Sequence, residues 1–197
     1  MITRQQALEI LHQHMKNQNL RRHCYAVDVV MRGLAKYFSN KDRSADAEAM
    51  ADKWGIAGLL HDADYEETKN DPSKHVVTVV SWLEKLDIDK NIINAIYAHG
   101  WKFVKSCPEP KNKMEWSLYC CDELTGLIVA VALVRPDKKL SSVTVESVMK
   151  KWDVKAFAAG VNREQIKMCE EKLDTPPSQF ITISLSAMQG IASELGL

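Results

Sequence analysis

A histidine stands in this sequence at a helix position where an apolar residue is expected. His23 follows Leu20 and precedes Val27, Val30 and Leu34, and this spacing of three and four residues places all of them on one face of a helix. An imidazole that faces a hydrophobic core needs a polar partner. It either hydrogen-bonds to a backbone carbonyl group, the more common case for a single buried histidine, or it binds a metal ion.

An aspartate occupies a similar position in a second apolar segment. Asp122 shares a helix face with Leu118, Thr125, Val129 and Leu133, in a segment that is apolar nearly all round. Burying an ionised carboxylate without compensation is very costly. Asp122 must therefore pair with a cation, accept several hydrogen bonds or bind a metal ion, and a structural salt bridge remains an equal alternative.

A His-Asp pair lies at the predicted end of another helix. His61 and Asp62 follow the apolar run 54–60 and precede the polar segment 63–74. Successive side chains of a helix point about 100° apart, but at a fraying end both can turn toward one point. The pair is a half-site for a divalent cation, although the dipeptide alone is weak evidence.

Two further histidines lie at predicted junctions between loop and helix. His75 precedes the apolar positions of one predicted helix, and His99 ends another helix, after Ile92 and Ile96. An exposed helix end explains each of them singly. Together with the His-Asp pair they are candidates for a second set of metal ligands.

Hydrophobic periodicity predicts that these residues are held by an all-α, single-domain helical bundle over 1–197. Thr3 with Gln6 predicts a capping box, and Ser44 and Ser178 predict helix starts. No alternating strand pattern, internal repeat or long linker interrupts the helical pattern. The predicted helices lie near 4–17, 19–38, 44–60, 75–86, 89–99, 114–134, 141–152, 162–172 and 178–195.

Composition excludes several classes of function. The 26 Lys and Arg residues balance 26 Asp and Glu residues, so we expect no extended nucleic-acid surface. The N-terminus is polar and the apolar run 124–134 is shorter than the roughly 20 residues that span a membrane, so we expect no signal peptide and no membrane partner. Five cysteines without a Cys-x-x-Cys pair indicate reduced thiols and a cytoplasmic location.

The order His23, His61-Asp62, Asp122 resembles the H…HD…D signature of the HD superfamily of metal-dependent phosphohydrolases. LRRHCYAV is similar to the first-histidine helix of that family, AGLLHDADYEETKNDPSKH to its His-Asp helix and loop, and YCCDELTGLIVA to its last helix. The resemblance covers about residues 20–135. The remainder, with RPDKKL and GVNREQI, resembles the bacterial single-domain branch called HDIG-type. It implies an HD-type bundle with the metal site between helices and with helices 141–197 packed on this core.

The resemblance also implies a ligand set. One metal ion would be held by His23, His61, Asp62 and Asp122. A second would share Asp62 and add two histidines, for which the later histidines stand in the right order; the sequence departs from the best-known two-metal pattern at 63–64 and at 100. The ligands implied are His23, His61, Asp62, His75, His99 and Asp122. Imidazole with carboxylate suits one or two ions of Mn, Fe, Co, Ni or Zn.

The reaction implied is hydrolysis of a phosphomonoester, phosphodiester or phosphoanhydride in a small phosphorylated, nucleotide-like substrate. A bound metal ion would activate water and polarise a phosphoryl oxygen. Asp62 is the expected bridge or orienting base, and Asp64 or Glu66 are candidates for a proton relay because they follow it closely.

Local cations must meet the charge of a phosphate because the chain has no net charge. For each cation taken singly, a solvated surface side chain is the more common explanation. The candidates nearest to the motif are Arg22, Lys69, Lys74 and Lys102.

Two other functions remain open at this stage. Some HD-type proteins with a similar ligand set hold two irons and activate oxygen, and a non-catalytic ligand-binding domain could retain the metal for stability. The segment 141–197 carries no recognisable chemistry. Its apolar positions suit either core packing or a homo-oligomer contact; they are Ile181, Leu185, Met188 and Ile191.

Overall fold

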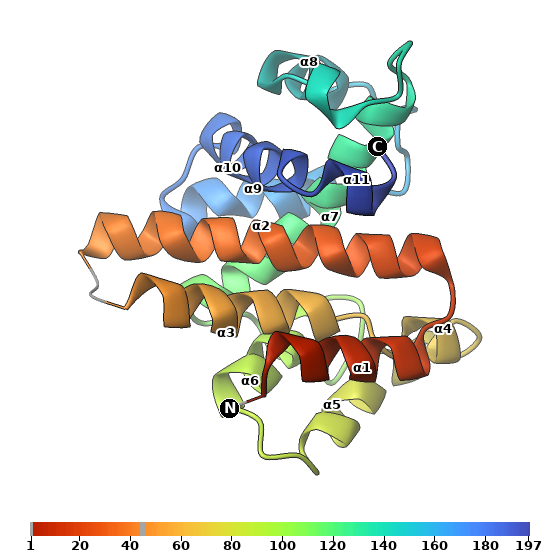
Figure 1. Cartoon of the computed structure of the whole chain (residues 1–197), viewed down its shortest axis with the longest axis vertical. Helices are drawn as coiled ribbons and strands as arrows, with labels where there is room; N and C mark the ends of the chain where they lie inside the picture. The colour runs from red at the N-terminus through yellow and green to blue at the C-terminus, as the bar shows by residue number, and fades with distance from the viewer. Residues whose placement is uncertain (1, 44–45) are drawn as a thin grey trace.

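The computed structural model describes residues 2–43 and 46–197, and this part of the chain is an all-α, single-domain fold (Figure 1). No strand occurs among the described residues. The α-helices are α1 (Arg4–His14), α2 (Gln18–Asp42), α3 (Ala47–Leu60), α4 (Tyr65–Thr68), α5 (Val77–Leu83), α6 (Lys90–His99), α7 (Lys113–Leu133), α8 (Val145–Trp152), α9 (Arg163–Leu173), α10 (Pro177–Gln189) and α11 (Ala192–Leu195). Two short 3-10 helices are η1 (Pro72–Lys74) and η2 (Leu140–Ser142).

Three long helices form the centre of the molecule. α2 and α3 run side by side across the view of Figure 1, and α7 packs against α2 behind them. Leu34, Leu59 and Leu127 are fully buried there, and each such side chain stabilises the fold by about 1.5–3 kcal/mol. α2, α3 and α7 therefore provide a rigid frame for any side chain that they carry.

A glycine allows α2 and α3 to approach closely. A Cβ atom at Gly58 would lie 2.8 Å from the carbonyl oxygen of Val27, a separation that real Cβ atoms essentially never show. Gly58 lies one turn before His61, and Val27 lies one turn after His23. The close approach therefore occurs beside the two histidines.

The predicted helix starts have mixed outcomes. The capping box of Thr3 and Gln6 is confirmed. Ser44 lies outside the described residues; the side chain of Asp46 caps α3 by accepting a hydrogen bond from the backbone of Ala49. The helix predicted near 178 is confirmed and starts one residue earlier, at Pro177, whose fixed φ angle suits the first helical position.

The polar segment after α3 is more structured than the sequence indicates. It contains α4 and η1, and α5 begins at Val77 rather than at 75. The prediction of a helix over 75–86 was wrong at its start because His75 is extended and Val76 has a φ angle of 68°. A positive φ is unfavourable for a β-branched residue, so the backbone beside His75 is strained.

The C-terminal helices cover the outer sides of the central frame. α10 and α11 pack on α2, and α9 packs on α7. Ile181 and Met188 are fully buried and Leu185 is nearly so, whereas Ile191 is half-buried. The sequence left core packing and a homo-oligomer contact open for these positions. Ile181, Leu185 and Met188 serve core packing.

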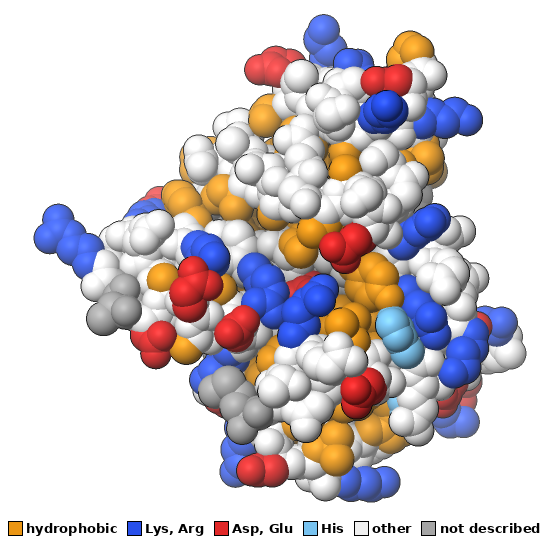
Figure 2. Space-filling view, in the orientation of Figure 1, with side chains coloured by type: hydrophobic (Ala, Val, Ile, Leu, Met, Phe, Trp, Pro, Cys, Tyr) orange, Lys and Arg blue, Asp and Glu red, His pale blue; other side chains and the backbone are white. Residues whose placement is uncertain are grey.

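α7 is the one helix among the described residues that is long and apolar enough to cross a membrane. However, 67% of its most apolar 18-residue window is buried inside the protein, which is typical of a core helix and is compatible with a soluble protein. Basic and acidic side chains are intermingled over the face seen in Figure 2.

Candidate metal centre

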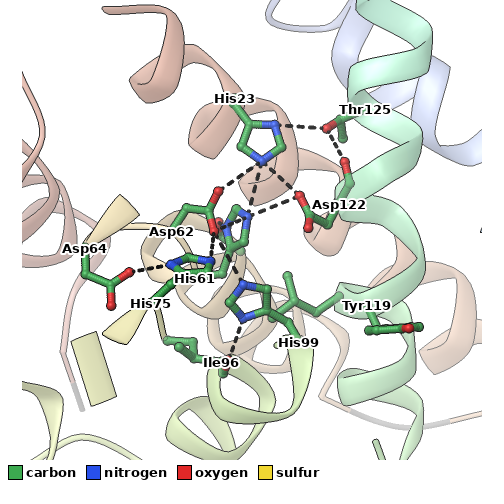
Figure 3. A network of polar contacts seen from close by, with 12 residues as sticks. His23, His61, Asp62, Asp64, His75, Ile96, His99, Tyr119, Asp122 and Thr125 are labelled. Atoms are coloured by element: carbon green, nitrogen blue, oxygen red, sulfur yellow. Dashed lines mark hydrogen bonds and ion pairs between the residues drawn. The ribbon is translucent and has the colours of Figure 1, made fainter. Parts of the chain in front are cut away.

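Three helices bring the first group of polar side chains together. His23 on α2 and Asp122 on α7 meet with 2.9 Å between Nε2 and Oδ1. His61, the residue after α3, places its Nε2 3.3 Å from Nε2 of His23 and 3.4 Å from Oδ1 of Asp122 (Figure 3). The two residues on apolar helix faces and the histidine of the His-Asp pair therefore form one cluster.

Asp62 lies between this cluster and the two remaining histidines (Figure 3). Its Oδ1 is 3.5 Å from Nε2 of His61, 3.3 Å from Nε2 of His75 and 3.4 Å from Nε2 of His99. Its Oδ2 is 3.7 Å from Nε2 of His23. One carboxylate thus contacts four imidazoles.

Two of the histidines are oriented by backbone carbonyl groups. Nδ1 of His61 lies 2.8 Å from the carbonyl oxygen of Gly58, and Nδ1 of His99 lies 2.5 Å from that of Ile96. A carbonyl oxygen only accepts, so each Nδ1 carries the hydrogen. The other ring nitrogen, Nε2, then points to the centre of the cluster.

The other two histidines are oriented by side chains. The hydroxyl group of Thr125 donates to the carbonyl oxygen of Asp122 at 2.8 Å, so it accepts from Nδ1 of His23 at 3.3 Å. Nδ1 of His75 donates to Oδ1 of Asp64 at 2.9 Å. All four imidazoles therefore direct Nε2 inward, which is the arrangement of metal-binding histidines.

The contact between two Nε2 atoms tests whether a metal ion fits. The Nε2 atoms of His23 and His61 face each other across 3.3 Å while each Nδ1 has an acceptor of its own. This contact is favourable when a metal ion lies between the two nitrogens or when one of them carries a proton. The described residues contain two groups whose ligand atoms lie within 4.8 Å of one another: His23, His61, Asp62 and Asp122, and Asp62, His75 and His99.

Without metal, protons meet the same electrostatic demand. Burial lowers the pKa of His61, but Asp62 and Asp122 outweigh it and raise that pKa to about 9. Burial likewise lowers the pKa of His75, and Asp62 with Asp64 raises it to about 10. The carboxylates therefore stabilise positive charge in the cluster. Protons and a metal ion would compete for the same imidazole nitrogens.

The two carboxylates of the cluster stay ionised. Burial raises the pKa of Asp62, but the charge of His61 and other imidazoles outweighs it and holds the pKa well below its usual range. Burial likewise raises the pKa of Asp122, and hydrogen bonds from His23 and His61 lower it further than burial raises it. Both side chains are therefore available as anionic ligands.

A cavity of about 400 Å³ opens in front of the second group of ligands. Its residues come from the segment after α3, from the end of α6 and the segment that follows it, and from α7. They are Asp62, Tyr65, Thr68, Lys69, Pro72, His75, His99, Gly100, Phe103, Val104, Asp122 and Glu123.

Of the four cations proposed to bind substrate, the structure places Lys69 in this cavity. Arg22 lies beside Gly196 at a separate pocket. Lys74 pairs with Asp71 at 3.0 Å, and the ammonium group of Lys102 lies 4.1 Å from the centre of the Trp101 ring.

The two proposed proton relays do not line the cavity. Asp64 is fully buried, and its Oδ2 accepts from the backbone N–H of Val79 at 3.0 Å while Oδ1 holds His75. Glu66 accepts from the backbone N–H groups of Lys16 and Asn17 at 2.7 and 2.9 Å. Both carboxylates thus have structural partners in place of a substrate.

Several residues of the site were not singled out from the sequence. Glu123 lines the cavity beside Asp122, and burial raises its pKa. Tyr65 and Phe103 also line the cavity. Thr125 orients His23, and a signal for it existed, because it shares the helix face of Asp122.

Comparisons with known proteins found no matching protein-family model, no similar curated protein and no similar solved structure.

Proposed function

We propose that this chain is an HD-type metal-dependent phosphohydrolase that binds two divalent transition-metal ions in adjoining sites sharing Asp62. The observation that carries the proposal is the common orientation of the four histidines. Each Nδ1 has an acceptor and each Nε2 points toward the shared carboxylate. A buried polar network formed only for stability would not need all four Nε2 atoms directed to one carboxylate.

The donor set supports a transition metal. The two groups offer imidazole nitrogen and carboxylate oxygen, and no thiolate belongs to either. These donors suit Mn, Fe, Co, Ni or Zn better than calcium. When bound, such ions lower the pKa of a coordinated water to about 7 and polarise a phosphoryl oxygen.

The residues of the chain would divide the remaining work. Asp62 would span the two sites because its oxygens reach all four imidazoles. Lys69 would bind a phosphate oxygen at the cavity wall. Asp64 would act as a positioning residue, fixing the ring of His75 rather than transferring a proton.

The substrate would be a small molecule, because the cavity of about 400 Å³ has the size of a small-ligand site. Its phosphoryl group is what the resemblance to HD-type phosphohydrolases implies. The five free, buried cysteines are consistent with a reducing cytoplasm.

The test combines metal analysis with a substrate panel. Protein purified without chelator or affinity metal would be reconstituted with each of the five metals. It would then be assayed with p-nitrophenyl phosphate, bis-p-nitrophenyl phosphate and inorganic pyrophosphate. We expect metal-dependent release of phosphate or p-nitrophenol, lost in Asp62→Ala and kept in a control, His12→Gln, whose imidazole contacts Tyr25 away from the site.

Two results would reject hydrolysis. Bound iron with metal-dependent oxygen consumption and no phosphoester turnover would indicate an oxygenase. A metal-dependent rise in melting temperature without any turnover would indicate a binding domain that uses the metal for stability.

A further inference from the structure

The walls of the cavity carry two exposed aromatic rings. Tyr65 on α4 is 44% exposed and Phe103 after α6 is 60% exposed, although both line the cavity in front of His75 and His99. Exposed aromatic side chains around a concave site are typical of a ligand-binding surface. The rings therefore provide apolar contact area that the protein itself leaves uncovered.

The ring of Tyr65 is held beside the metal centre. It packs edge-to-face on the imidazole of His75, with 5.4 Å between ring centres. Because His75 also contacts Asp62, a flat group that lies against Tyr65 is close to the reacting centre. The apolar wall and the metal ligands thus belong to one continuous site.

The charges of the wall limit how many phosphates a ligand can carry. Lys69 is the one Lys or Arg among the described residues that line the cavity, and no carboxylate of the described residues lies within ion-pair distance of it. Lys74, five positions further along the chain, is paired with Asp71 and does not line the cavity. Beside the two proposed metal ions, one unpaired ammonium group suits a single phosphoryl group, whereas a polyphosphate chain that extends away from the ions would need further cations.

A carboxylate among the residues that line the cavity can accept a hydrogen bond. Oε2 of Glu123 accepts the backbone N–H of Asn162 at 2.9 Å, which fixes the side chain from outside the cavity. No described residue donates to Oε1. A hydroxyl or amino group of a ligand can therefore donate to Glu123.

We infer that the substrate is a monophosphate ester of a small alcohol that carries a flat ring and a hydrogen-bond donor. The phosphoryl group would lie against the metal ligands and Lys69, the ring between Tyr65 and Phe103, and the donor on Glu123. Hydrolysis breaks the ester P–O bond: water gives its hydroxyl to phosphorus and its proton to the leaving alcohol, so phosphate and the alcohol are released without any redox change. This inference rests on the proposed function.

The first test measures binding without turnover. Benzylphosphonate and ethylphosphonate are non-hydrolysable and differ by the ring, and their affinities for the metal-loaded protein can be measured by calorimetry. We expect benzylphosphonate to bind about tenfold more tightly because it contacts both aromatic rings. Equal affinities would overturn the inference, even if phosphoesters are hydrolysed.

Matched variants separate cavity contacts from general surface effects. Phe103→Ala should remove most of the preference for benzylphosphonate, whereas Leu86→Ala, which removes a side chain 47% exposed outside the cavity, should leave it unchanged. Lys69→Gln should weaken the binding of both phosphonates, and Lys74→Gln should change neither affinity. The inference is wrong if Phe103→Ala and Leu86→Ala have the same preference for benzylphosphonate and if Lys69→Gln and Lys74→Gln bind both phosphonates equally well.

The kinetic readout distinguishes this inference from the proposed function. In metal-loaded wild type, kcat/KM should be higher for 1-naphthyl phosphate than for glycerol 3-phosphate, and Phe103→Ala should reduce only the first. Similar kcat/KM values for both esters would refute the ring site and leave the hydrolase proposal standing. A ring preference in binding without hydrolysis of any ester would refute the hydrolase and leave the ring site standing.

Discussion

The two halves of the proposed metal centre are built on different kinds of structure. His23, His61 and Asp122 come from α2, the end of α3 and α7, which form the buried centre of the molecule. His75 lies between η1 and α5, and His99 is the last residue of α6. The core thus fixes the first half, whereas short elements that line the cavity fix the second.

The second half depends on one buried carboxylate. Asp64 holds the ring of His75 through Oδ1 and the first turn of α5 through Oδ2. Between them Val76 has a φ angle of 68°, a strained conformation for a β-branched residue. We therefore expect the first ion to bind tightly and the second to be the one whose affinity responds to local changes.

The largest effect should follow from removing a core ligand. Asp122→Ala deletes the carboxylate that contacts both His23 and His61. The first ion should bind at least about 100-fold more weakly, a larger effect than the 10–100-fold typical of an outer-shell partner. Calorimetric metal titration measures this. If Asp122→Ala binds the first ion as tightly as wild type does, the core half is not a metal site.

A smaller and selective loss should follow from Asp64→Asn. The amide keeps the size of the side chain but cannot accept from both His75 and Val79, so the ring of His75 loses its fixed orientation. We expect about 10–100-fold weaker binding of the second ion and little change at the first. Glu66→Gln is the matched control because that carboxylate caps the backbone of Lys16 and Asn17. Equal losses at both sites in Asp64→Asn would contradict the division of the centre into two halves.

Thr125→Val tests the core half more gently. The isosteric change removes the acceptor for Nδ1 of His23 while α2 and α7 keep the histidine in place. The first ion should bind roughly tenfold more weakly, the lower end of outer-shell effects, and Thr125→Ser should restore the affinity. If Thr125→Ser is as weak as Thr125→Val, the lost affinity does not arise from the hydroxyl group.

Gly58→Ala should affect the fold more than the chemistry. The added Cβ would press on the backbone of Val27 at 2.8 Å and separate α2 from α3, lowering the free energy of unfolding by about 1–3 kcal/mol. Metal affinity should fall only slightly. Gly126→Ala is the control because its Cβ would meet Val161 at an ordinary 3.7 Å. Denaturant titration measures the free energy of unfolding of both variants. Equal values for Gly58→Ala and Gly126→Ala would contradict the close contact between α2 and α3.

The same contrast explains how much could be predicted from the sequence. His23 and Asp122 could be recognised because each interrupts an apolar stripe, and long periodic helices are the elements that such stripes predict best. All six candidate ligands lie in the two groups that the structure brings together.

The second half was harder to predict because its segment has no periodicity. The bond from Asp64 to the backbone of Val79 spans 15 positions and depends on tertiary folding. Proximity in sequence therefore suggested a proton relay where the structure has a buried anchor. Tyr65 and Phe103 carry no sequence signal, because only the folded chain places them on one cavity.

Metal stoichiometry tests the central claim most directly. Wild-type protein, stripped with chelator and titrated with Mn²⁺ or Zn²⁺, should bind two ions per chain in two steps of unequal affinity. Asp62→Ala, which removes the shared carboxylate, should bind neither ion at comparable concentrations. If wild type binds no transition metal after reconstitution, or if Asp62→Ala binds both ions like wild type, the cluster is not a metal centre.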